Sequence, residues 1–166
     1  HDALPISATL LSAAFVLLAL VLADIPTREE RTGLGRVLAA TPGAGGRLAA
    51  VKLLGTAGVA LLLLAPLGAR ASTAHDFALP AAVAGACFAA ALAVLLGRAT
   101  GSPKPFVGLL LALWYVAVND KGRTAALDVA GFGGAATAAS VAGWLGVAAL
   151  LAGAALLLER LKQSRE

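Results

Sequence analysis

Charged and aromatic side chains are both scarce in this chain. Asp, Glu, Lys and Arg make up 13% of the 166 residues, against about 25% in ordinary globular domains. Hydrophobic residues make up 60% of the chain, and its mean hydropathy is +0.89. A soluble domain of this size does not need apolar stretches that are long enough to cross a bilayer. The composition therefore predicts an integral membrane protein.

Sulfur and imidazole ligands are nearly absent. Cys87 is the only cysteine, so no internal disulfide can form. The sequence has no methionine, and His1 and His75 are its only histidines. These residues can assemble neither a metal-ligand set nor a pair of axial haem ligands. We therefore predict no metal and no other cofactor.

Motifs for nucleophilic catalysis and for nucleotide binding are missing as well. No Gly-x-Ser-x-Gly elbow occurs, and the glycine-rich run Gly131–Gly134 lacks the lysine of a phosphate loop. That run is expected to be a flexible loop. Basic residues are not interleaved with aromatics, as an RNA-binding surface requires. The chain is thus predicted to have no ATPase site of its own and to bind no nucleic acid.

Five apolar stretches occupy most of the sequence. Four contain about 17–20 residues and one is shorter, compared with the roughly 20 residues that cross hydrocarbon as a helix. Their hydrophobic residues are continuous rather than confined to one stripe. We predict an all-α integral membrane protein, a polytopic helical bundle with five transmembrane helices. The spans are Ser7–Ala23, Leu48–Leu67, Leu79–Gly97, Phe106–Val118 and Ser140–Leu158.

Lysine and arginine fall mainly in alternate connections between these spans. Ten of the 13 basic residues lie on one side of the predicted topology and three on the other. The positive-inside rule places the larger group in the cytoplasm. We therefore predict a multi-pass protein of the inner or plasma membrane with a cytoplasmic C-terminus. The ten are Arg28, Arg31, Arg36, Arg47, Lys52, Arg98, Lys104, Arg160, Lys162 and Arg165, and the three are Arg70, Lys121 and Arg123.

The beginning of the chain suggests a truncation. His1–Ile6 resembles a translated sequencing adapter, and we interpret these six residues as an artefact. The predicted topology would place the start of Ser7–Ala23 outside the cell, which is unusual for a helix without a domain before it. Both observations favour a sixth helix that is missing upstream.

Residues 24–50 form a polar segment between the first two spans, on the predicted cytoplasmic side. Thr27 and Glu30 have the spacing of a capping box, which predicts the start of a helix. The Thr-Pro pair at 41–42 would end it, and the glycine-rich run 43–46 would form a flexible turn. The pattern predicts a short amphipathic helix at the cytoplasmic interface.

The periodicity of this helix leaves two interpretations open. In one, the helix rests on anionic lipid headgroups, where each arginine contributes about 1 kcal/mol. In the other, it docks a cytoplasmic partner, because Glu29 and Glu30 offer charge that a lipid surface does not reward.

Part of this segment resembles a known family. Arg28-Glu29-Glu30-Arg31-Thr32-Gly33, followed by Val37-Leu38-Ala39-Ala40-Thr41-Pro42 and then by Arg47 and Lys52, is similar to the first cytoplasmic loop of type-2 ATP-binding-cassette permeases. The sequence departs from the family pattern at Gly35-Arg36, where an acidic residue is common, and at the glycine-rich run 43–46.

The resemblance implies a function for the chain. Residues 7–166 would be the transmembrane permease domain of an ATP-binding-cassette exporter, with residues 24–50 as its coupling loop. ATP would be hydrolysed by a separate cytoplasmic ATPase subunit, and a second permease copy or homologue would complete a dimer in the lipid bilayer. The residues implied to contact the ATPase are Arg28, Glu29, Glu30, Arg31 and Arg36.

A non-transport membrane scaffold or assembly factor is the alternative function, with the same loop lying on lipid. A partner ATPase encoded alongside would distinguish the two.

Three further expectations concern residues outside the loop. Asp120, Lys121 and Asp128 form a candidate outer gate, and Trp114-Tyr115 is expected in the interfacial aromatic belt. Lys52 is the only ionisable residue placed inside a span, near its end, and is expected to snorkel to the interface.

Overall fold

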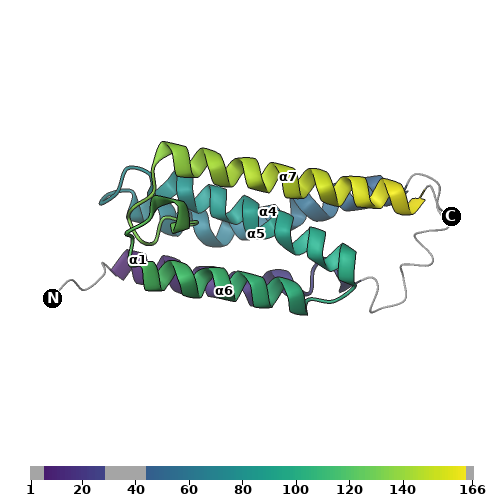
Figure 1. Cartoon of the computed structure of the whole chain (residues 1–166), viewed down its shortest axis with the longest axis horizontal. Coiled ribbons are helices and arrows are strands. Elements are labelled where there is room, and N and C mark those ends of the chain that lie inside the picture. Colours follow the sequence, from purple (N-terminus) through teal and green to yellow (C-terminus); the bar gives the residue numbers. More distant parts are fainter. Residues whose placement is uncertain (1–5, 29–43, 164–166) are drawn as a thin grey trace.

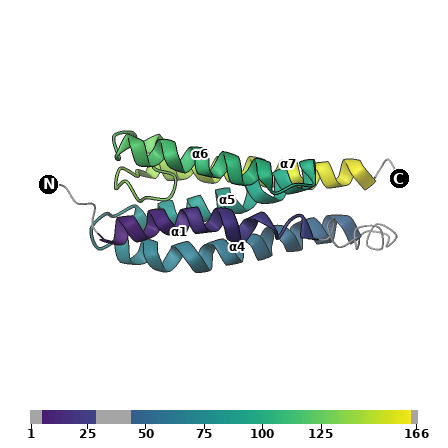
Figure 2. The same cartoon turned by 90° about the horizontal axis from the view of Figure 1, so that it is seen from below.

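The computed structural model describes residues 6–28 and 44–163. The described residues form five α-helices, one short 3₁₀ helix and no strand, which confirms the all-α class. The long helices run side by side in alternating directions, so that consecutive helices are antiparallel (Figures 1 and 2). Their bounds are α1 Ile6–Ala23, α4 Ala44–Ala71, α5 Ala78–Thr100, α6 Lys104–Asp120 and α7 Ala138–Gln163, with η1 at Ala125–Leu127.

The two ends of the bundle carry different connections. Helices α1, α5 and α7 finish at the end where the C-terminus lies, which we call the C-terminal end (Figure 1). Residues 24–28, the start of α4 and the short connection from α5 to α6 lie there too. The N-terminal end carries the connection from α4 to α5 and the longer one from α6 to α7 (Figure 2).

Each predicted span corresponds to one of these helices, but the helices are longer than the predicted spans. Three of them, over Arg47–Ala71, Ala78–Thr100 and Ala138–Lys162, are long and apolar enough to cross a membrane. Helix α6 has 17 residues, and α1 spans the 18 residues Ile6–Ala23, of which Thr9–Ala23 have described side chains and form a shorter apolar helix. Five membrane crossings therefore stay a prediction. The turn expected at 43–46 is wrong after residue 43, because α4 already begins at Ala44.

Helix α5 lies at the centre of the bundle. Of the most apolar 18-residue stretch of each helix, 67% is buried in α5, compared with 28% in α4 and 11% in α7. Most of the buried residues of α5 are alanines. Small side chains let neighbouring backbones approach closely, which is the usual basis of helix packing in lipid. The alanine-rich sequence of α5 therefore suits its central place.

Larger apolar side chains occur both in the core and on the exterior. Helix α1 buries Leu11, Phe15, Leu18 and Leu22, which share one face at helical spacing. Large side chains such as Leu54 on α4 and Leu150 on α7 are about three quarters exposed, at 74% and 75%. Exterior leucines over an alanine-rich centre are what a lipid environment favours, because hydrocarbon imposes no penalty on exposed apolar surface.

Candidate functional site

The segment after α1 is wedged between α4 and α5 at the C-terminal end. Pro26 lies so close to α5 that a Cβ added at Gly97 would stand 2.7 Å from the Cβ of Pro26. Thr27 is fully buried beside it, and its hydroxyl donates to the carbonyl of Asp24 at 3.5 Å. We call residues 24–28 the loop root, because the predicted coupling loop continues from them.

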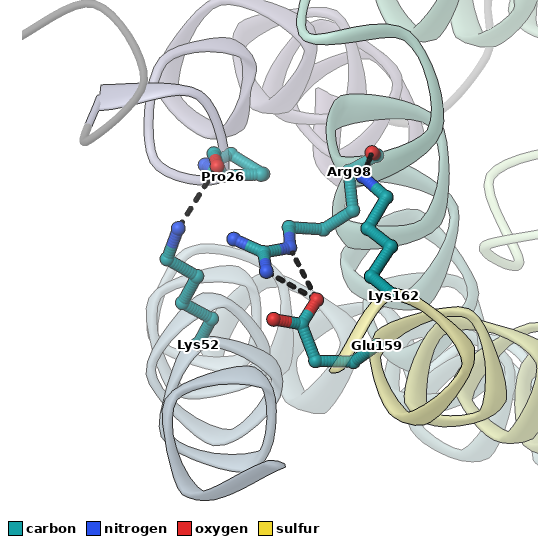
Figure 3. A network of polar contacts seen from close by, with 5 residues as sticks. All are labelled: Pro26, Lys52, Arg98, Glu159 and Lys162. Atoms are coloured by element: carbon teal, nitrogen blue, oxygen red, sulfur yellow. Dashed lines mark hydrogen bonds and ion pairs between the residues drawn. The ribbon is translucent and has the colours of Figure 1, made fainter. Parts of the chain in front are cut away.

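Lys52 ties the loop root to α4. Its Nζ donates to the carbonyl oxygen of Pro26 at 3.0 Å, and only 6% of the residue is exposed (Figure 3). The Lys52 carbonyl in turn accepts a hydrogen bond of 2.6 Å from the Thr56 hydroxyl. The side chain does reach toward the C-terminal end, as expected, but it ends on a buried carbonyl rather than at an open interface. The cation therefore fixes the loop root in place.

A second tie joins α5 to α7 at the same end. The Arg98 guanidinium forms an ion pair with Glu159, with Nε donating to Oε2 at 3.0 Å (Figure 3). Both side chains are largely buried, with exposed fractions of 11% for Arg98 and 8% for Glu159. One turn further along α7, the Lys162 Nζ donates to the Arg98 carbonyl at 2.8 Å. Lys162 thus supplies a donor to one of the carbonyls that the end of α5 leaves without a helical partner.

Sequence reasoning missed this pair. It placed Arg98 in a connection, did not consider Glu159, and found no ionisable residue inside a span except Lys52. Helix α5 continues to Thr100 and α7 to Gln163, so both charges lie in the last turns of helices rather than in connections. One signal in the sequence could have indicated the pair. Arg98 and Glu159 each directly follow a predicted span, and both spans end on the same side of the predicted topology.

Of the five predicted ATPase contacts, only Arg28 can be placed. It is exposed, has helical backbone and follows the buried Thr27. Glu29, Glu30, Arg31 and Arg36 lie outside the described residues, as does most of the predicted amphipathic helix. Their docking role stays a prediction.

The candidate outer gate residues lie at the N-terminal end, but each has its own local role. The Asp120 carboxylate accepts hydrogen bonds from the Thr124 backbone N–H and hydroxyl at 2.6 and 3.0 Å. Lys121 is exposed and adopts a left-handed backbone with φ 53°. Asp128 is buried, and its carboxylate accepts three backbone N–H groups, from Gly133 and Ala135 at 2.9 Å and from Ala136 at 3.1 Å. A gate built from these residues stays a prediction.

The glycine-rich run that we expected to be a flexible loop is part of a packed segment. Residues 128–132 are buried, and the Phe132 ring packs against Phe15 of α1 with centroids 6.0 Å apart. A Cβ added at Gly85 of α5 would stand 2.9 Å from the Val129 carbonyl oxygen. The run was misread because its burial depends on the Asp128 hydrogen bonds and on contacts with distant helices, which a glycine count does not show.

Two other groups of residues also lie toward the N-terminal end. The indole of Trp114 donates to the Ser12 hydroxyl of α1 at 2.9 Å, so this ring packs inside the bundle, whereas Tyr115 is 63% exposed. His75 and Asp76 line a cavity of about 240 Å³ together with Gly134 and neighbouring residues. Within residues 6–28 and 44–163, no three His, Cys, Asp or Glu side chains gather closely enough to hold a metal ion.

The polar network at the C-terminal end is therefore the strongest candidate for a functional site. It contains no nucleophile paired with a base, but it links the loop root to α4 and α5, and α5 to α7. Such an arrangement can pass on a movement or hold helices together. No protein-family model matches the chain, and no curated protein or solved structure is similar to it.

Proposed function

We propose that this chain is the permease subunit of an ATP-binding-cassette exporter, which moves its substrate with ATP hydrolysed by a separate ATPase subunit. The observation that supports it most is the loop root. A loop that only rests on lipid needs no fixed attachment, yet Pro26 is held by Lys52 and packed against Gly97. A displacement of the loop would therefore be transmitted directly to two helices of the bundle, α4 and α5.

The proposed mechanism starts at the ATPase. Closure of the ATPase subunits around ATP displaces the loop segment from Arg28 to Thr41, which they contact. The loop root transfers this displacement to α4 through Lys52 and to α5 through Gly97. Because packed helices have discrete arrangements rather than a continuum, such a shift favours a rigid-body change of the bundle. The bundle then exposes a pathway toward the outside.

The distribution of charge supports the orientation that this mechanism needs. The described basic residues at the C-terminal end of the bundle outnumber the three at the N-terminal end, which are Arg70, Lys121 and Arg123. The positive-inside rule then puts the C-terminal end in the cytoplasm, where the ATPase is. Five crossings of the inner or plasma membrane and a second permease copy complete the proposed assembly.

The docking part of the proposal is tested by charge reversal in the loop. The chain is co-expressed with the ATP-binding-cassette ATPase encoded beside it, reconstituted in vesicles, and assayed for stimulated ATP hydrolysis. We expect the double variant Glu29→Lys/Glu30→Lys to lose most of the stimulation while inserting into the membrane as the unchanged chain does. The matched control is Asp76→Lys, which reverses an exposed carboxylate at the opposite end.

Each outcome of this assay has a definite meaning. Stimulation that is lost in the loop variant and kept in the control supports the exporter. Equal stimulation in both variants refutes docking through Glu29 and Glu30. If no ATPase is encoded nearby and none co-purifies with the inserted chain, the exporter proposal fails and the scaffold is favoured.

A further inference from the structure

The Arg98–Glu159 pair is an unusual way to hold two helices of this composition together. Elsewhere α5 and α7 pack through small apolar residues and through Phe88 and Trp144, whose rings meet edge to face with centroids 4.8 Å apart. A largely buried ion pair adds little stability compared with well-packed apolar residues of similar size. A charged pair that is largely buried near the ends of two apolar helices therefore suggests a function other than stability.

The position of the pair suggests what that function is. Helices α5 and α7 run in the same direction, with Phe88 and Trp144 in their first halves and Arg98 and Glu159 in their last turns (Figure 1). The aromatic contact can stay in place while the charged ends separate. Separation would cost buried apolar area only near the C-terminal end, and it would expose the two charges there to water.

The loop root touches α5 next to this pair. Gly97, against which Pro26 packs, directly precedes Arg98 in the last turns of α5. A displacement of Pro26 would therefore disturb its hydrogen bond from Lys52 or its contact with the α5 backbone next to Arg98. The Lys162 hydrogen bond to the Arg98 carbonyl would be strained by the same movement.

We infer that Arg98 and Glu159 form an ionic latch, which keeps the C-terminal ends of α5 and α7 together and opens when the loop root is displaced. The latch itself follows from the geometry of the pair. Its opening by ATP rests on the proposed function. Arg98 and Glu159 are accordingly positioning residues, which set the arrangement of two helices.

The latch is tested with a buried reporter thiol. Cys87 is replaced by alanine, and Ala155 of α7, which is 1% exposed and one turn before Glu159, is replaced by cysteine. The full chain in vesicles is labelled with a membrane-impermeant maleimide. We expect Glu159→Gln to raise the labelling rate about tenfold or more, where tenfold corresponds to about 1.4 kcal/mol in the opening equilibrium.

Two variants control for loss of charge and for general damage. Arg160→Gln removes an exposed charge from the next position of α7 and should leave the labelling rate unchanged. The swap Arg98→Glu/Glu159→Arg reverses the pair and should restore protection of the thiol. Equal labelling in Glu159→Gln and Arg160→Gln, or fast labelling in the swapped chain, overturns the latch.

A second arm separates the latch from the exporter proposal. Adding the partner ATPase with ATP should raise the labelling rate of the chain with an intact pair, and Glu29→Lys/Glu30→Lys should abolish that increase. If labelling depends on the pair and no ATPase is stimulated by the chain, the latch holds and the exporter proposal fails. If ATP drives ATPase stimulation without any change in labelling, the exporter stands and the latch is wrong.

Discussion

Substitution of Gly97 by alanine tests the contact through which the loop root meets α5. The new Cβ would stand 2.7 Å from the Cβ of Pro26, closer than real carbon atoms approach, and 3.4 Å from the Cγ2 of Thr27. Neither neighbour is the far end of a flexible side chain, so the loop root itself must move. Overpacking of this kind costs about 1–3 kcal/mol.

Helix propensity acts in the opposite direction and must be removed from the comparison. Alanine in place of glycine stabilises a helix interior by about 0.5–1 kcal/mol. Gly58 of α4 provides the control, because a Cβ added there meets nothing within 4 Å. The propensity gain is common to both variants, so Gly97→Ala should be less stable than Gly58→Ala by the overpacking cost of about 1–3 kcal/mol.

The assay is unfolding of the purified chain in mixed micelles by titration with a denaturing detergent, followed by far-ultraviolet circular dichroism. A double-mutant cycle with Pro26→Gly identifies the partner, because glycine lacks the Cβ that the new methyl would meet. In the Pro26→Gly background the penalty of Gly97→Ala should disappear. Equal free energies of unfolding for Gly97→Ala and Gly58→Ala, or a penalty that persists without the proline, would refute the wedged loop root.

Two further predictions concern the N-terminal half of the bundle. Asp128→Asn replaces an acceptor of three backbone N–H groups by a side chain with a single acceptor oxygen, and should lower the free energy of unfolding by about 2–4 kcal/mol. The half-buried Asp120→Asn should cost less than about 1 kcal/mol in the same detergent titration; equal losses would argue against the packed segment. Ser12→Ala removes the acceptor of the Trp114 indole and should cost about 1 kcal/mol, with a changed tryptophan emission spectrum. An unchanged spectrum and stability would mean that α6 does not pack on α1 through this bond.

The charged pair shows why part of the site could not be predicted. Arg98 and Glu159 are 61 residues apart, and both directly follow the apolar spans drawn from the sequence. The pattern of basic residues put Arg98 and the C-terminal tail that begins with Glu159 on the same side of the membrane. It could not pair them, because that requires the position of each helix in the bundle and its rotation about its axis.

The packed segment at the N-terminal end was misread for a related reason. Its glycines are typical of a loose loop, but Gly131 has a left-handed backbone, with φ 77°, in a place where a Cβ would stand 3.0 Å from that of Ala81. Glycine is used here for close approach and for a positive φ. Only the neighbouring helix distinguishes this use from flexibility.

The sequence by itself determined the all-α class, the place of all five long helices to within a few residues at most boundaries, and the side on which basic residues gather. These follow from apolar length and from charge, which are local properties of the chain. The tertiary structure alone decided that α5 is central, that Lys52 holds Pro26, and that Arg98 meets Glu159. The physical reason is that the helices are apolar on nearly every face. Their hydrophobicity therefore does not select a rotation, and the orientation of each helix depends on close packing of small residues and on a few buried polar contacts.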